Sequence, residues 1–105
     1  MYQLYFYVPP EKLDDLLDAL FAAGAGSYGA YDRCCWVTEG HGQFRPLANS
    51  QPHLGKQGEV MRVKELKVEM ICTDTNIAKV VAALKEHHPY EQPAYGVIKL
   101  HMTKP

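Results

Sequence analysis

Four stretches of the chain have the residue composition of β-strands, and three of them alternate apolar with polar residues at a period of two. Successive side chains of a strand point to opposite faces, so this alternation predicts a sheet with one face against a core. It is clearest where Leu66, Val68 and Met70 face one way with charged residues between them. The predicted strands are residues 2–8, 28–38, 60–72 and 95–102.

Two other stretches repeat apolar residues at the spacing of an amphipathic helix. The first follows Pro10, whose fixed φ suits a first helical turn, and ends before Gly24. The second follows the candidate N-caps Thr73 and Asp74 and ends before Pro89. The apolar positions are Leu13, Leu16, Leu17, Leu20 and Phe21 in the first helix and Ile77, Val80, Val81 and Leu84 in the second.

Between the second and third strands, Gly40 and Gly42 predict a turn, after which residues 43–45 pair back as a short β arm. The predicted order is therefore β-α-β-(β arm)-β-α-β. Two β-α-β units predict an α+β fold of the ferredoxin-like, split βαβ type in one domain of residues 1–105. Its antiparallel sheet would carry two helices on one face and the extra arm.

The face of the sheet without helices is predicted to carry Tyr5, Tyr7, Tyr95 and Val97. Such a face is too apolar to remain in water. We therefore expect a homo-oligomer, a dimer or a trimer, that covers this face or the extended strand edges.

Composition narrows the class of protein. The 105 residues are 47% hydrophobic and 22% charged with a net charge of −1, which is typical of a globular domain. Scattered charges leave no basic stripe for nucleic acid, and the apolar runs are too short for a membrane span. The first residues have no cationic secretory signal, and three cysteines do not form a disulfide framework, so we expect a cytoplasmic protein.

Two blocks of residues resemble a known family. The first is Thr-Glu-Gly-x-Gly-x-Phe-Arg-Pro at residues 38–46, and the second is His-Pro-Tyr-Glu at residues 88–91. Together they resemble the insert domain of the "interacting factor three"-like proteins, also called GTP cyclohydrolase I type 2 homologues. The resemblance extends over residues 4–100.

The resemblance implies a fold like that of the trimeric signalling protein PII and of the copper-tolerance protein CutA. In larger members of the family this PII/CutA-like module is inserted into a separate core that carries the ligands of two metal ions. That core has no counterpart in this sequence, so we expect the insert standing alone, without the metal-dependent activity of the family name.

Residues 47–58 are the only long irregular segment, within a loop region of residues 40–58, and segments of this length in a small domain are usually functional or involved in assembly. In PII-like proteins a loop at this place reaches ligands or partners. We therefore expect it to bind a small anionic ligand, with glycine N–H groups near the anion, or a protein partner; the alternative is that it wraps a neighbouring subunit. The candidate ligand-binding residues are Glu39, His41, Arg45, His53, Tyr90 and Glu91.

A divalent or transition metal ion is the alternative ligand, because imidazole, thiolate and carboxylate groups bind such ions. The candidate metal ligands are His88, Glu91, His41 and Cys34. Cys34 and Cys35 are adjacent in a predicted strand and point to opposite faces, so they do not readily share one ion. In the competing structural interpretation, His88 ends a helix and Tyr90 packs with its hydroxyl bonded.

We therefore expect a non-catalytic, oligomeric binding or regulatory domain with no required cofactor. A metal-binding protein is the first alternative. A cysteine-dependent enzyme, with Cys34 activated by His41 or His88, is the second, and it needs a base within hydrogen-bond reach of the thiol.

Overall fold

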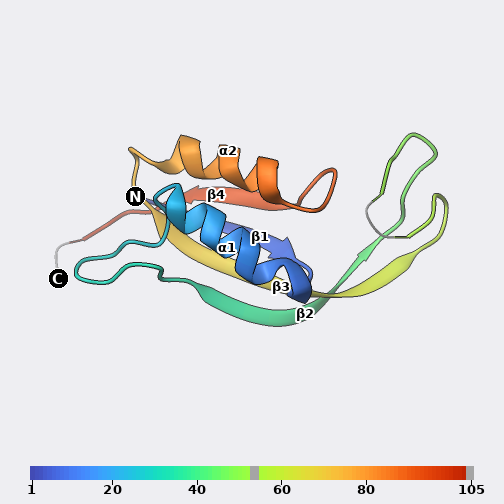
Figure 1. The fold of residues 1–105 in the computed structure, drawn as a ribbon, viewed down its shortest axis with the longest axis horizontal. Helices are drawn as coiled ribbons and strands as arrows, with labels where there is room; N and C mark the ends of the chain where they lie inside the picture. Colours follow the sequence, from blue (N-terminus) through green and yellow to red (C-terminus); the bar gives the residue numbers. More distant parts are fainter. Residues whose placement is uncertain (53–54, 104–105) are drawn as a thin grey trace.

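The computed structural model describes residues 1–52 and 55–103, and it forms a four-stranded antiparallel sheet with both helices packed on one face (Figure 1). The strand order is β2-β3-β1-β4. The α+β architecture and the predicted order of elements are confirmed. The elements are β1 (Tyr2–Val8), a 3-10 turn (Pro10–Lys12), α1 (Leu13–Ala22), β2 (Trp36–Phe44), β3 (Met61–Cys72), α2 (Ile77–His87) and β4 (Tyr95–Lys99).

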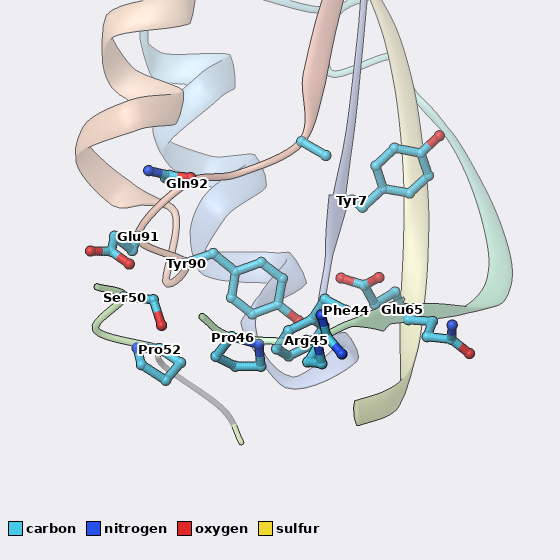
Figure 2. Close-up of a pocket in the computed structure, with 12 residues that line it drawn as sticks. Tyr7, Phe44, Arg45, Pro46, Ser50, Pro52, Glu65, Tyr90, Glu91 and Gln92 are labelled. Carbon is cyan, nitrogen blue, oxygen red and sulfur yellow. The ribbon is translucent and has the colours of Figure 1, made fainter. Parts of the chain in front are cut away.

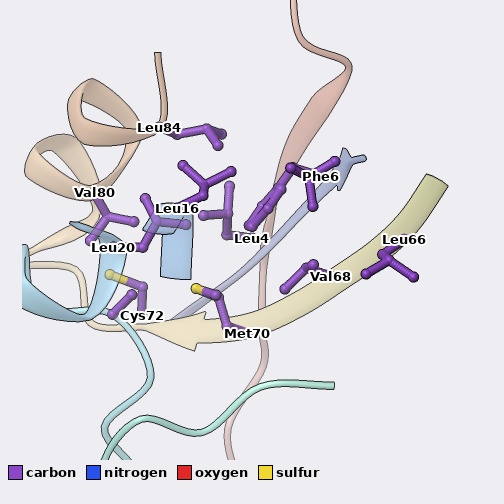
Figure 3. Packing of buried hydrophobic residues seen from close by; sticks show 12 residues of the cluster. Leu4, Phe6, Leu16, Leu20, Leu66, Val68, Met70, Cys72, Val80 and Leu84 are labelled. Atoms are coloured by element: carbon purple, nitrogen blue, oxygen red, sulfur yellow. The ribbon is translucent and has the colours of Figure 1, made fainter. Parts of the chain in front are cut away.

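The core lies between the sheet and the two helices (Figure 3). The alternating residues of β1 and β3 point into it because both strands are central in the sheet, with helices above one face only. The apolar side chains of the two helices, which repeat at i, i+3 and i+4, pack against these strand residues in the core. The buried apolar side chains include Leu4, Phe6, Val8, Leu16, Leu20, Leu66, Val68, Met70, Cys72, Val80 and Leu84.

The turn predicted at Gly40 and Gly42 is wrong, because β2 runs straight through both glycines. Gly40 pairs with Glu65 and Gly42 with Val63 on β3. β1 pairs with β3 only from Leu66 onward, so residues 40–44 and 61–65 project beyond the rest of the sheet. We call these residues the β2–β3 arm; Figure 1 shows it extending away from the helices. The predicted arm is thus the outer half of a long hairpin.

The two sets of alternating residues on β4 lie on the opposite sides of the sheet from those predicted. Its register with β1 places Tyr95 opposite Phe6, so Tyr95 and Val97 lie on the helix side. The placement of these two residues on the other face was therefore wrong. Gly96 lies on that other face, and the Tyr5 ring covers it so closely that a Cβ there would come within 2.3–2.4 Å of ring and hydroxyl atoms.

The sheet face without helices, which we call the open face, holds aromatic and apolar side chains around a polar centre. Gln3 donates a hydrogen bond to Glu69 at 3.2 Å, and Lys67 lies 3.6 Å from the same carboxylate. Trp36 on the edge strand β2 is 68% exposed and Ile98 on the edge strand β4 is 48% exposed. Within the described ranges, no helix has the length and apolar character needed to cross a membrane.

Candidate functional site

A cavity of about 260 Å³ lies where the β2–β3 arm meets the segment that follows α2 (Figure 2). Both sequence blocks line it, the first through Phe44 and Arg45 and the second through Tyr90 and Glu91. β1 and β3 contribute one side chain each. We call this cavity the Tyr90 pocket, and its principal side chains are Tyr7, Phe44, Arg45, Glu65, Tyr90 and Glu91.

His88 fixes the segment that carries Tyr90. It is the C-cap of α2: its N–H donates to the Leu84 carbonyl at 2.9 Å, and its backbone is extended, as the following proline requires. Its buried ring bonds at both nitrogens. Nε2 contacts the Tyr7 carbonyl oxygen at 2.6 Å, and Nδ1 accepts from the Tyr90 N–H at 3.0 Å. The ring proton therefore belongs on Nε2, and the ring joins the end of β1 to Tyr90.

The Tyr90 side chain points from its loop toward the arm (Figure 2). Its ring lies 6.4 Å from that of Phe44, centroid to centroid. Its hydroxyl is buried and lies near the Glu65 carboxylate. Burial, followed by the negative charge and the hydrogen bond of Glu65, raises the pKa of Tyr90 well above its usual range, with a smaller contribution from Glu11. The hydroxyl is therefore a proton donor, not an anion, at neutral pH.

Glu65 occupies space that a glycine leaves open. It lies in the part of β3 beyond β1, and its side chain crosses over Gly42 on β2. A Cβ at Gly42 would lie 1.6 Å from the Glu65 Oε1. Any larger residue at this position would therefore push the carboxylate out of its place beside Tyr90.

The outer wall of the pocket is tied across the chain. The Glu91 carboxylate accepts a hydrogen bond from the Gln51 N–H at 3.0 Å, joining the segment after α2 to the loop at the tip of the arm. Arg45 lies at the exposed rim. The polar groups around the pocket thus include two carboxylates and one guanidinium.

The structure brings together part of the predicted ligand-binding set. Arg45, Tyr90 and Glu91 line the Tyr90 pocket, whereas Glu39 and His41 border a second hollow farther along β2. His53 lies outside the described residues. Tyr7, Phe44 and Glu65 were not among the residues predicted from the sequence to bind a ligand, although Phe44 belongs to the first block.

The predicted metal ligands do not converge. Among the residues that the structure describes, no group of three or more His, Cys, Asp or Glu side chains could hold a metal ion. Both ring nitrogens of His88 are engaged, and the Glu91 carboxylate accepts from Gln51. Cys34 precedes β2 and His41 lies in its outer half, so about 20 Å of strand separates them.

The thiols show no sign of activation as nucleophiles. Cys34 Sγ lies 3.6 Å from the Asp32 carbonyl oxygen, and this oxygen is not a base that could remove its proton. Burial raises the pKa of the Cys35 thiol, as does the neighbouring Cys34. Burial also raises the pKa of the Cys72 thiol, which belongs to the core. At neutral pH the Cys35 and Cys72 thiols are therefore protonated.

The raised pKa of Tyr90 predicts a pH dependence of stability. Above the ordinary tyrosine pKa of about 10, the unfolded chain releases this proton and the native chain keeps it, so stability is lost as pH rises. Tyr90→Phe should reduce the slope of unfolding free energy against pH in this range by at most about 1 kcal/mol per pH unit. Urea unfolding between pH 9 and 11 measures it. As a control, Tyr28→Phe, which replaces an exposed tyrosine, should keep the slope of the natural chain. If Tyr90→Phe also kept that slope, the raised pKa of Tyr90 would be contradicted.

The chain is similar to a segment of longer known proteins. No family model matches the chain. The chain is 43% identical to the GTP cyclohydrolase 1 type 2 homolog of Halalkalibacterium halodurans, over 95% of its own length and 27% of that protein. The structure of a Bacillus cereus protein related to NIF3 superimposes with a TM-score of 0.80 at 33% identity, covering 94% of this chain and 25% of that one. The chain is homologous to this segment of the GTP cyclohydrolase 1 type 2 homologues.

The fold is also that of CutA. CutA1 from Pyrococcus horikoshii matches with a TM-score of 0.71 at 17% identity, over 99% of this chain and 87% of that one. The PII-like protein CutA from Nostoc sp. matches with a TM-score of 0.68 at 20% identity, over 95% and 81%. The predicted PII/CutA-like fold is therefore confirmed. Since the chain spans about a quarter of the curated relatives, the activity in their name belongs to those longer proteins.

Proposed function

We propose that this chain is a non-catalytic binding domain that takes a small ligand in the Tyr90 pocket and works as a homo-oligomer. The observation that carries the proposal is the meeting of the two sequence blocks, more than 40 residues apart, around one cavity. Ligand sites are concave, largely apolar, and furnished with a few placed polar groups. The Tyr90 pocket is lined by three aromatic residues, two carboxylates and one guanidinium, and the Glu91 carboxylate is held by the Gln51 N–H.

The oligomer is supported by the open face. Trp36 and Ile98 stand on the two edge strands of the sheet, and both are large apolar side chains that water covers in the single chain. Covering them with a second copy would remove this exposed apolar surface. A dimer and a trimer both satisfy this requirement.

We place this single domain of residues 1–105 in the cytoplasm. The three cysteines are free and distributed between the core and the surface, which suits a reducing compartment.

Filling the pocket tests its role. Ala94 lines the pocket and is exposed to it, so Ala94→Phe should occupy the ligand space while leaving the core intact. A bound ligand raises the melting temperature by mass action. Compounds from a small-molecule set that stabilise the natural chain in thermal unfolding should therefore fail to stabilise Ala94→Phe. The variant Ala82→Phe, on the exposed side of α2, should keep the response.

Two results would contradict the proposal. In the first, compounds stabilise the Ala94→Phe variant as well as the natural chain. In the second, no compound of any charge class stabilises the natural chain.

A further inference from the structure

The half-buried carboxylate of Glu65 lines the Tyr90 pocket. Among the described residues Glu65 forms no ion pair. The nearby cations of the arm are engaged elsewhere: Lys64 lies 3.4 Å from Glu39, and Arg62 donates to Gln43 at 2.8 Å. On the same face Lys67 is directed to Glu69, at 3.6 Å.

Tyr90 does not neutralise this charge. The raised pKa of Tyr90 keeps the proton on its own hydroxyl at neutral pH, so Tyr90 brings no positive charge to the Glu65 carboxylate. A carboxylate in partly buried surroundings is screened less by salt than one on the surface. The pocket therefore presents a fixed negative charge to whatever enters it.

Three aromatic residues line the same pocket, and the rings of Phe44 and Tyr90 lie 6.4 Å apart, centroid to centroid. Tyr7, Phe44 and Tyr90 all line the pocket and are half-buried (Figure 2). The face of an aromatic ring attracts a cation, most strongly where water is excluded, and cages of such rings recognise ammonium groups. Rings and carboxylate together form a site for a positive group with an apolar surface.

The remaining charges agree with this assignment. Glu91 adds a second carboxylate, which accepts a hydrogen bond from the Gln51 N–H at 3.0 Å. Arg45 is the one cation that lines the pocket within the described part of the chain, and it is exposed at the rim. The formal charge of the lining is thus −1, from two carboxylates and one guanidinium.

We infer that the Tyr90 pocket recognises a small organic cation, holding its ammonium group between the Glu65 carboxylate and the rings of Tyr7, Phe44 and Tyr90. This inference rests on the proposed function and names the ligand class of the same site. It differs from the anionic ligand expected from the sequence, because that expectation rested on glycine N–H groups of residues 40–58, whereas two carboxylates line the pocket. Arg45 at the rim could then contact an anionic group on the far end of the same ligand.

Three probes of one shape and different charge test the inference: choline, its neutral isostere 3,3-dimethylbutan-1-ol, and the anion 3,3-dimethylbutanoate. Titrations of the natural chain followed by NMR should show shifts of the Tyr7, Phe44 and Tyr90 ring protons with choline. The affinity for choline should exceed that for either other probe at least tenfold. Glu65→Gln should lose at least tenfold in choline affinity, and Glu86→Gln, which removes an exposed charge on α2, should lose none.

The outcomes separate the two claims. Equal or tighter binding of the neutral or anionic probe in the pocket would overturn the choice of a cation and leave the proposed binding role standing. Ring shifts with none of the three probes would overturn both. Because the comparison of probes uses the natural chain, it holds even if Glu65→Gln folds poorly.

Discussion

Replacing His88 by alanine is expected to lower the free energy of unfolding by about 2–4 kcal/mol. The imidazole is 7% exposed and serves two backbone groups, the Tyr7 carbonyl and the Tyr90 N–H. Alanine lacks the ring that pairs with these two backbone groups, so both lose their partner, and a cavity is left at the end of β1. Each buried polar group without a partner costs about 1–3 kcal/mol. This is a large part of the total stability of a small domain, about 5–15 kcal/mol.

The adjacent histidine provides a matched control. His87 is exposed and lies 3.9 Å from the Glu86 carboxylate, so His87→Ala should change the unfolding free energy by less than about 0.5 kcal/mol. Urea unfolding of both variants at pH 7.5 measures the difference. Equal stability of the two variants would show that His88 does not join β1 to the Tyr90 segment.

Placing aspartate at both Trp36 and Ile98 is expected to convert the proposed oligomer to single chains of 11.8 kDa. Both side chains are exposed on the open face, and an unpaired carboxylate buried in an interface costs several kcal/mol, so association should weaken at least about 100-fold. Light scattering coupled to gel filtration gives the mass. The natural chain should show two or three times the mass of one chain.

Tyr31→Asp is the control for added charge on an exposed aromatic position. Tyr31 is 75% exposed but lies outside the four strands, in the segment between α1 and β2, so this variant should keep the mass of the natural chain. A natural chain of 11.8 kDa would refute the oligomer. A double variant that keeps the natural mass would show that another surface mediates assembly.

The sequence predicted the fold well where local pattern and tertiary contacts agree. The alternation of β3 and the helical spacing of Leu16 and Leu20 each depend on one buried face, and that face is visible in the residues themselves. The turn predicted at the glycines of β2 was wrong because local preference and tertiary contacts disagree there. Glycine favours turns locally, but pairing of Gly40 and Gly42 with β3 overrides this preference.

The faces of β4 and the centre of the pocket depend on partners distant in sequence. Both sides of β4 are apolar, so only its register with β1 decides that Tyr95 faces the helices. Glu65 belongs to the polar half of an alternating strand, where a carboxylate usually faces solvent. Its role in the pocket arises from Tyr90, 25 residues later, and from the space above Gly42.

The most direct test of the binding account is a set of intermolecular nuclear Overhauser effects between the natural chain and a bound compound that stabilises it. The account predicts contacts from the compound to the ring protons of Tyr7, Phe44 and Tyr90, all in one pose. Contacts to Trp36 and Ile98 on the open face, or to none of the three rings, would contradict it.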